Sequence, residues 1–203
     1  GKDVSYRNSS GTEMNEAYKF PGEGTFSGLF NPRSFVVANA NDPRWHQQLQ
    51  KMADHAFELG ANCVFYDQMG YAESITNWDL SKEFPVPDLQ VILNKAEAMK
   101  KIHDYIDKRD KEMAIGIEWI TDVTSQHVDF VHGIFGAGTA GTGNRHTNFI
   151  DWFRYTFPEV IITFRDLDGN ESDVEWQSNR AAMLGLRSNL QTFRLRGLID
   201  ETP

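Results

Sequence analysis

Hydrophobic and polar positions along the chain follow two alternating periods. Short apolar runs, in which alternate positions face opposite ways, are separated by longer stretches with apolar residues three or four positions apart. The first pattern predicts strands and the second predicts helices. The expected strands are residues 34–42, 61–67, 113–119, 127–133 and 160–166.

The helix boundaries carry their own signals. Asp42 is placed to cap the first helix, Pro43 occupies its first turn, and Gly60 follows its last apolar residue. Further helices are expected after Asp88 and over residues 147–157 and 172–195. Strands that alternate with helices predict parallel βαβ units with right-handed crossovers, so the expected fold class is α/β.

Composition and charge narrow the classes of partner. The 203 residues, 40% of them hydrophobic, can bury one sizeable core. A formal net charge of −9 disfavours binding to nucleic acid or to an anionic membrane, because phosphate would be repelled. The single cysteine, Cys63, excludes an intramolecular disulfide framework and a thiolate zinc site, and it is expected in the core. The histidines show no paired ligand spacing, so neither a metal nor another cofactor is expected.

The segments outside the predicted helices and strands indicate a domain boundary and the end of the sheet at which a site is expected. Residues 1–33 are rich in Gly, Ser, Asn and Pro and are expected to form a loop-rich excursion before the main domain, residues 34–203. No run is apolar and long enough for a membrane span, and the N-terminal residues show no signal-peptide pattern. The loops that follow the strands are longer than the loops that precede them, so a site is expected at the carboxyl ends of the strands.

Two carboxylates are predicted at that edge. In a parallel barrel the bulky face of each strand packs against helices, and the other face points to the interior. In residues 113–119 the bulky side chains occupy the odd positions, which leaves Glu118 facing inward at the end of the strand. The same alternation places Asp67 on one face with Cys63 and Phe65. A glycosidase needs two such acids, one to protonate the leaving oxygen and one to attack or stabilise the sugar cation.

The residues around these acids also resemble a known group of enzymes. The segments WHQQLQKMADHAFELGANCVFYDQMG, AIGIEWITDVTSQHVDFVHG and FRYTFPEVIITFRDLDG are similar to the middle of (β/α)8-barrel glycoside hydrolases. The resemblance covers residues 34–190. It is to uncharacterised glycosidases of gut and environmental bacteria, which are similar to endo-α-N-acetylgalactosaminidases and, more distantly, to the α-galactosidase clan.

That resemblance implies roles for the acids. It implies that Asp67, at the end of the fourth barrel strand, is the nucleophile and that Glu118, on the fifth, is the acid/base. The α-galactosidase clan uses an Asp on the sixth strand instead. Asp166 is the second candidate for the acid/base in this chain, because it ends the last predicted strand. The resemblance also implies a bacterial enzyme of carbohydrate metabolism and favours a periplasmic or extracellular location. For each acid a structural role stays open, since Asp67 could cap a turn and Glu118 could form an ordinary ion pair.

A wider set of residues is expected to bind the sugar. Aromatic side chains in the loops can stack on sugar faces, although simple packing is the alternative. His132 suits a contact to a substrate hydroxyl, with a purely structural histidine as the alternative, and only one of Arg165 and Asp166 can face inward. The expected substrate-binding residues are Asn39, Tyr71, Trp78, Trp119, His132 and Arg165.

Two other functions stay open. The string GAGTAG, residues 136–141, matches the glycine fingerprint of dinucleotide-binding domains, and Asp166 ends the next strand. The polar residues TGNRHTN follow it where an apolar helix face should begin, which argues against a nucleotide site. A carbohydrate-binding barrel without catalysis would keep the same site residues as the enzyme.

A full barrel typically needs about 250 residues and eight strands. The five predicted strands correspond to about the third to the seventh, so the chain is expected to be a fragment or a natural half of a barrel. An open parallel sheet exposes strand edges and inward apolar side chains, which predicts self-association.

Overall fold

The structure is a computed structural model, and it describes residues 4–14, 36–70, 75–80, 87–110, 112–119, 121–132, 149–167 and 171–190. The chain divides into two compact units. The first comprises residues 1–60 and 72–110, and the second comprises residues 61–71 and 111–203. The boundary predicted at residue 33 lies outside the described residues.

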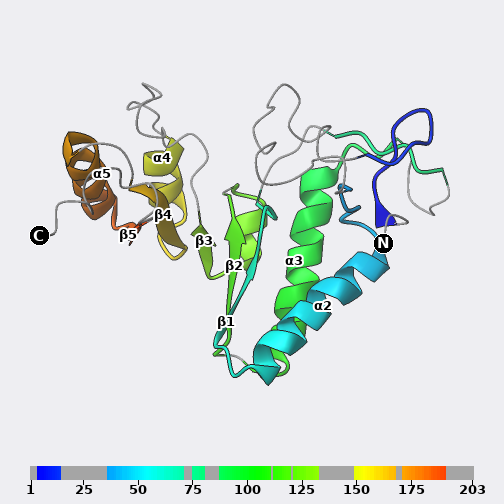
Figure 1. The fold of residues 1–203 in the computed structure, drawn as a ribbon, viewed down its shortest axis with the longest axis horizontal. Coiled ribbons are helices and arrows are strands. Elements are labelled where there is room, and N and C mark those ends of the chain that lie inside the picture. Colours follow the sequence, from blue (N-terminus) through cyan, green and yellow to red (C-terminus); the bar gives the residue numbers. More distant parts are fainter. Residues whose placement is uncertain are drawn as a thin grey trace, which may run out of the picture. The chain divides into compact units, whose positions relative to one another are not determined.

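Two helices dominate the first unit and pack against each other (Figure 1): α2 (Pro43–Glu58) and α3 (Val91–Asp107). The predicted cap of α2 is confirmed, since Asp42 Oδ1 accepts a hydrogen bond from the Arg44 N–H at 2.9 Å. Gly60 follows the helix with φ of 70°. Asp88 accepts hydrogen bonds from the Gln90 N–H and from the Asn94 side chain at the start of α3.

A polar cluster joins the far ends of α2 and α3. Asp54 of α2 accepts a hydrogen bond from the Tyr105 hydroxyl of α3 at 2.7 Å. The Arg109 guanidinium pairs with the same carboxylate and lies 4.3 Å from the centre of the Phe57 ring. One carboxylate therefore links α2 to the last turn of α3 and to the segment that follows α3.

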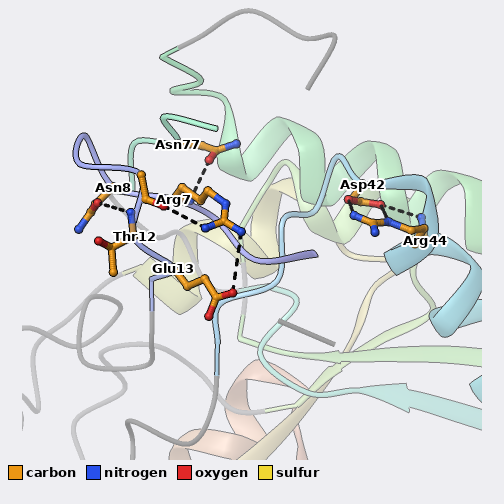
Figure 2. A network of polar contacts seen from close by, with 8 residues as sticks. Arg7, Asn8, Thr12, Glu13, Asp42, Arg44 and Asn77 are labelled. Atoms are coloured by element: carbon orange, nitrogen blue, oxygen red, sulfur yellow. Dashed lines mark hydrogen bonds and ion pairs between the residues drawn. The ribbon is translucent and has the colours of Figure 1, made fainter. Parts of the chain in front are cut away.

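The N-terminal residues of the first unit form a small polar network (Figure 2). Arg7 and Glu13 form an antiparallel bridge, and their side chains approach to 3.8 Å. The Arg7 N–H donates to Asn77 Oδ1 at 3.1 Å, and the Thr12 N–H donates to Asn8 Oδ1 at 2.9 Å. The bond from Arg7 connects the N-terminal segment to Asn77, seventy positions away along the chain.

The second unit is built on a parallel sheet of five strands in sequence order (Figure 1). Every pairing is parallel, as predicted. The strands are β1 (Cys63–Tyr66), β2 (Ala114–Glu118), β3 (Phe130–His132), β4 (Ile161–Leu167) and β5 (Arg187–Leu190). The segment before β3 contains the 3-10 helix η4 (Thr124–His127).

Two helices of the second unit complete the βα alternation: α4 (Phe149–Thr156) and α5 (Glu171–Leu184). Helix α5 packs on β4 and β5. The Arg154 side chain of α4 donates hydrogen bonds to the carbonyl oxygens of Pro158, Val160 and Leu184, at 2.6, 3.0 and 3.1 Å. A single cation thus holds the entry to β4 beside the carboxyl end of α5, where the helix dipole favours positive charge.

Two expected elements differ from the structure. The segment expected as the first strand is not part of this sheet, because Ala38 forms an isolated antiparallel bridge with Ser5 in the first unit. The helix expected over 172–195 ends at Leu184, because Gly185 adopts φ of 66° and the Leu186 N–H returns to the Ala181 carbonyl. This arrangement is a Schellman motif, which terminates a helix. Four of the five predicted strands therefore belong to this sheet, and its fifth strand, β5, lies in a segment that was expected to be helical.

Among the described residues, no helix combines the length and the apolar character that a membrane span requires.

Candidate functional site

The two faces of the sheet differ in burial, as the predicted alternation requires. One face carries apolar side chains that are at most 6% exposed: Val64, Tyr66, Ile115, Ile117, Val131 and Ile162. Residues at alternate positions belong to the opposite face, because side chains along a strand point to the two faces in turn. We call this opposite face the inner face, and it carries Phe65, Gly116, Glu118, Phe130, His132 and Thr163.

A polar row crosses the inner face at the carboxyl ends of the strands. Glu118 lies opposite His132 in the register, and His132 lies opposite Thr163. The Nδ1 atom of His132 is 2.6 Å from the Thr163 hydroxyl oxygen, and that hydroxyl also donates to the Val131 carbonyl at 3.2 Å. Glu118 is only 5% exposed. The row therefore combines a shielded carboxyl group with an oriented imidazole.

An aromatic row lies one step below the polar row. Phe65 and Phe130 stack with ring centroids 6.2 Å apart and an interplanar angle of 18°. Gly116 pairs with both residues in the register, and a Cβ atom there would lie 2.1 Å from the Phe130 ring. The Phe65 ring also meets His132 edge to face, with centroids 5.7 Å apart. The missing side chain at Gly116 is what lets the Phe130 ring lie across β2, so the aromatic row forms an apolar floor under the polar row.

The loops that follow β1 and β2 are joined through their backbones. The Gly70 N–H donates to the Glu118 carbonyl at 2.8 Å, and the Trp119 N–H donates to the His132 carbonyl at 3.0 Å. Gln68 and Trp119 adopt φ of 58° and 69°. Left-handed backbone is unfavourable for residues with a side chain, and such residues concentrate at functional sites. Trp119 consequently leaves the strand geometry, and the alternation of faces does not extend to it.

Asp67 follows β1 directly and is exposed. Tyr66, the last residue of β1, pairs with Ile117, so Asp67 and Glu118 are the next positions along these two neighbouring strands. The chain turns at Asp67, and the Gly70 hydrogen bond to Glu118 returns the loop to the end of β2. The structure thus brings the backbones of Asp67, Glu118 and His132 together at the carboxyl ends of neighbouring strands of one sheet.

The other predicted residues are placed as follows. Asn39 and Trp78 belong to the first unit, where Asn39 is fully buried and Trp78 is 40% exposed. Arg165 and Asp166 lie on β4, but their side chains are not among those that the structure describes. Tyr71 and the glycine-rich residues 136–141 also lie outside the described residues. Trp119 is partly buried beside the polar row. The roles assigned to these residues, and the expected sugar partner and self-association, stay predictions.

Cys63 was expected in the core, and that prediction is wrong. The side chain is exposed, since Cys63 lies on the inner-face side of β1, the edge strand of the sheet. Partial burial of the thiol, together with the negative charge of Asp129, raises the pKa of Cys63. A thiol with a raised pKa is mostly protonated at neutral pH and is a poor nucleophile.

Three residues of the site were not singled out from the sequence: Gly70, Gly116 and Thr163. Gly70 and Gly116 could have been noticed as glycines within or just after strands, a position that often marks close backbone approach. Thr163 carries no comparable signal, because its role depends on the register between β3 and β4. Among the described residues, no group of three or more His, Cys, Asp and Glu side chains is arranged to hold a metal ion.

Comparison with known proteins adds a structural likeness. No protein-family model and no curated protein matches the sequence. Among solved structures, an α-galactosidase from Thermus thermophilus in complex with stachyose matches with a TM-score of 0.59 at 12% identity. The match covers 95% of this chain and 42% of the α-galactosidase, so the chain spans less than half the length of that enzyme.

This likeness concerns the fold. The chain has an α/β fold with the parallel sheet and alternating helices of part of a (β/α) barrel. A distant structural neighbour of the chain is therefore a glycoside hydrolase.

Proposed function

We propose that this chain carries the catalytic centre of a retaining glycoside hydrolase, with Asp67 as nucleophile and Glu118 as acid/base. The observation that carries the proposal is the position of Glu118. It is 5% exposed, lies at the carboxyl end of β2 and pairs with His132 in the register. Asp67 and Glu118 each follow a residue of the Tyr66–Ile117 pair. Active sites of parallel barrels lie at this end of the strands.

The two acids differ in their exposure to water. A carboxyl group shielded from water keeps its proton more readily, which suits the group that protonates the leaving oxygen. Glu118 is shielded in this way, whereas Asp67 is exposed. In the proposed mechanism the Asp67 carboxylate attacks the anomeric carbon. The aromatic row of Phe65 and Phe130 supplies an apolar surface below this pair.

The spacing of the strands favours retention of configuration. Neighbouring parallel strands lie about 4.8 Å apart. Carboxyl groups at equal depth on β1 and β2 can therefore approach the roughly 5 to 5.5 Å of a retaining pair. An inverting pair needs roughly 6.5 to 9.5 Å, to leave space for a water molecule. If Asp166 on β4 were the acid instead of Glu118, two more strands would separate the groups, and the spacing of neighbouring strands would no longer favour retention.

Substitution of the two acids tests the proposal. Asp67→Asn should abolish hydrolysis of aryl α- and β-glycosides while sugar binding is retained. Glu118→Gln should lose hydrolysis of sugars with poor leaving groups and keep much of it with activated aryl groups, because these leave without protonation. Asp122→Asn and Glu159→Gln remove exposed carboxylates from the same unit and serve as matched controls. Normal hydrolysis of an unactivated glycoside by either site variant contradicts the assignment.

A second candidate is a carbohydrate-binding barrel that does not catalyse hydrolysis. The exposure of Asp67 favours it, since a nucleophile that forms a covalent sugar intermediate usually works where water is restricted. Calorimetric titration with galactosides, beside an assay for released sugar, separates the two functions. Binding without release by the longest polypeptide that carries the chain supports this second candidate.

A further inference from the structure

Two asparagines of the first unit, Asn39 and Asn77, have fully buried side chains. Both hold the same N-terminal stretch, residues 4–7. The Asn39 N–H donates to the Val4 carbonyl at 2.8 Å, and Asn77 Oδ1 accepts from the Arg7 N–H at 3.1 Å (Figure 2). The two buried side chains therefore lie at the two joints of this stretch with the rest of the unit.

The orientation of each side-chain amide is fixed by its oxygen. Asn77 Oδ1 accepts a second hydrogen bond, from the Asp79 N–H at 3.2 Å. Asn39 Oδ1 accepts from the Asn41 N–H at 3.0 Å. A backbone N–H can only donate, so the atom that meets it has to be the amide oxygen and not the nitrogen. Figure 2 accordingly shows the Asn77 nitrogen pointing away from Arg7.

The nitrogen of each amide is the polar atom that is left over. The backbone of Asn77 exchanges two hydrogen bonds of 2.9 Å with Asp88, and the Asn39 carbonyl accepts from the Asp42 N–H at 3.0 Å. Both Nδ2 atoms are buried, and within the described parts of the chain neither has an acceptor. A buried donor without an acceptor costs free energy, and most buried donors in proteins are paired with protein or with water.

We propose that Asn39 and Asn77 each donate from Nδ2 to an enclosed water molecule. A fully buried amide is out of reach of a large ligand, and water is an acceptor small enough to share such a position. The water can pass its own protons to neighbouring carbonyl oxygens, which have two lone pairs each. The two waters complete the joints that hold residues 4–7. For Asn39 this is an alternative to the sugar contact expected from the sequence.

Magnetisation transfer between water and the side-chain amide protons tests the proposal in the intact chain. Triple-resonance spectra of the labelled chain assign the amide signals, so no substitution is needed. Laboratory-frame and rotating-frame spectra separate an enclosed water from proton exchange, because only the enclosed water gives cross-peaks of opposite sign in the two. We expect such cross-peaks at Asn39 and Asn77. Asn94 is the matched control, since its Nδ2 already donates to Asp88 Oδ2 at 2.7 Å, and it should show none.

A crystal structure gives an independent reading. We expect a water oxygen within about 3.2 Å of each Nδ2 atom. Cross-peaks of enclosed water that are missing at both asparagines overturn the proposal. An oxygen of the chain in hydrogen-bond contact with Nδ2, in place of the water, overturns it for the asparagine concerned.

Discussion

Gly70 and Glu118 are joined by a backbone hydrogen bond of 2.8 Å, at a place where no side chain would fit. A Cβ atom on Gly70 would lie 2.0 Å from the Trp119 carbonyl oxygen and 2.7 Å from that of Glu118. Both contacts are to backbone, which cannot rotate away as a side chain can. The close approach of these two loops therefore fixes where the proposed acid/base sits relative to the loop that follows Asp67.

Gly70→Ala should destabilise the second unit by about 3 kcal/mol, because the backbone of Trp119 has to shift. The matched control is Gly185→Ala in the same unit, where nothing lies closer to the added Cβ than the Arg154 side chain at 3.6 Å. That control suffers only from its left-handed φ, a cost of about 1 to 2 kcal/mol. Urea unfolding of the two variants measures the difference, and an equal loss would show that the loop adapts.

Gly116 and Phe130 should be coupled energetically. Gly116→Ala pushes a methyl group into the Phe130 ring, and overpacking of this kind costs about 1 to 3 kcal/mol. In a Phe130→Leu background the ring is gone and the same substitution should cost less. A double-mutant cycle by urea unfolding should give a coupling energy of about 1 kcal/mol. Additive effects would mean that the ring does not lie over Gly116.

Tyr105 gives a pH dependence to the first unit. The hydrogen bond to Asp54, and then burial, raises the pKa of Tyr105 above its usual value. The protonated phenol is therefore favoured in the folded state. Its stabilisation is complete below the unfolded value of about 10 and is lost as the pH rises through the higher folded value.

Tyr105→Phe should therefore have a lower free energy of unfolding than the wild-type chain. The difference should be constant up to about pH 9 and shrink above about pH 10. Subtracting the ultraviolet titration curve of Tyr105→Phe from that of the wild-type chain should show the raised pKa of Tyr105 directly. Asp54→Asn should bring it back towards the ordinary value, since the negative charge is removed. A difference titration at the ordinary value would show that the contact between Tyr105 and Asp54 is not made in solution.

Local pattern was sufficient for much of the fold. The parallel class, the α2 cap at Asp42 and the buried odd positions of β2 follow from period and capping, which depend on residues close together in sequence. The end of α5 was missed although Gly185 stands immediately after its last residue. A glycine within an apolar stretch is tolerated in helices, so the left-handed turn that ends α5 and allows β5 needed the structure.

The site was less accessible to sequence reasoning. Glu118, Asp67 and His132 could be named because each falls at or next to a strand end, a local property. The pairing of His132 with Thr163, and of Gly70 with Glu118, depends on the register between strands that are distant in sequence. Register is set by packing of the whole sheet, so no local pattern specifies these contacts.

The assignment of Asp67 is tested most directly by trapping the covalent intermediate. An activated fluoro-glycoside forms a slowly hydrolysed bond to the nucleophile of a retaining glycosidase, and mass spectrometry of the digested chain locates it. We expect one glycosyl group on the peptide that contains Asp67, and none in Asp67→Asn. A label on Asp166 or on another residue, or steady hydrolysis of aryl glycosides with no label at all, would contradict the proposed mechanism.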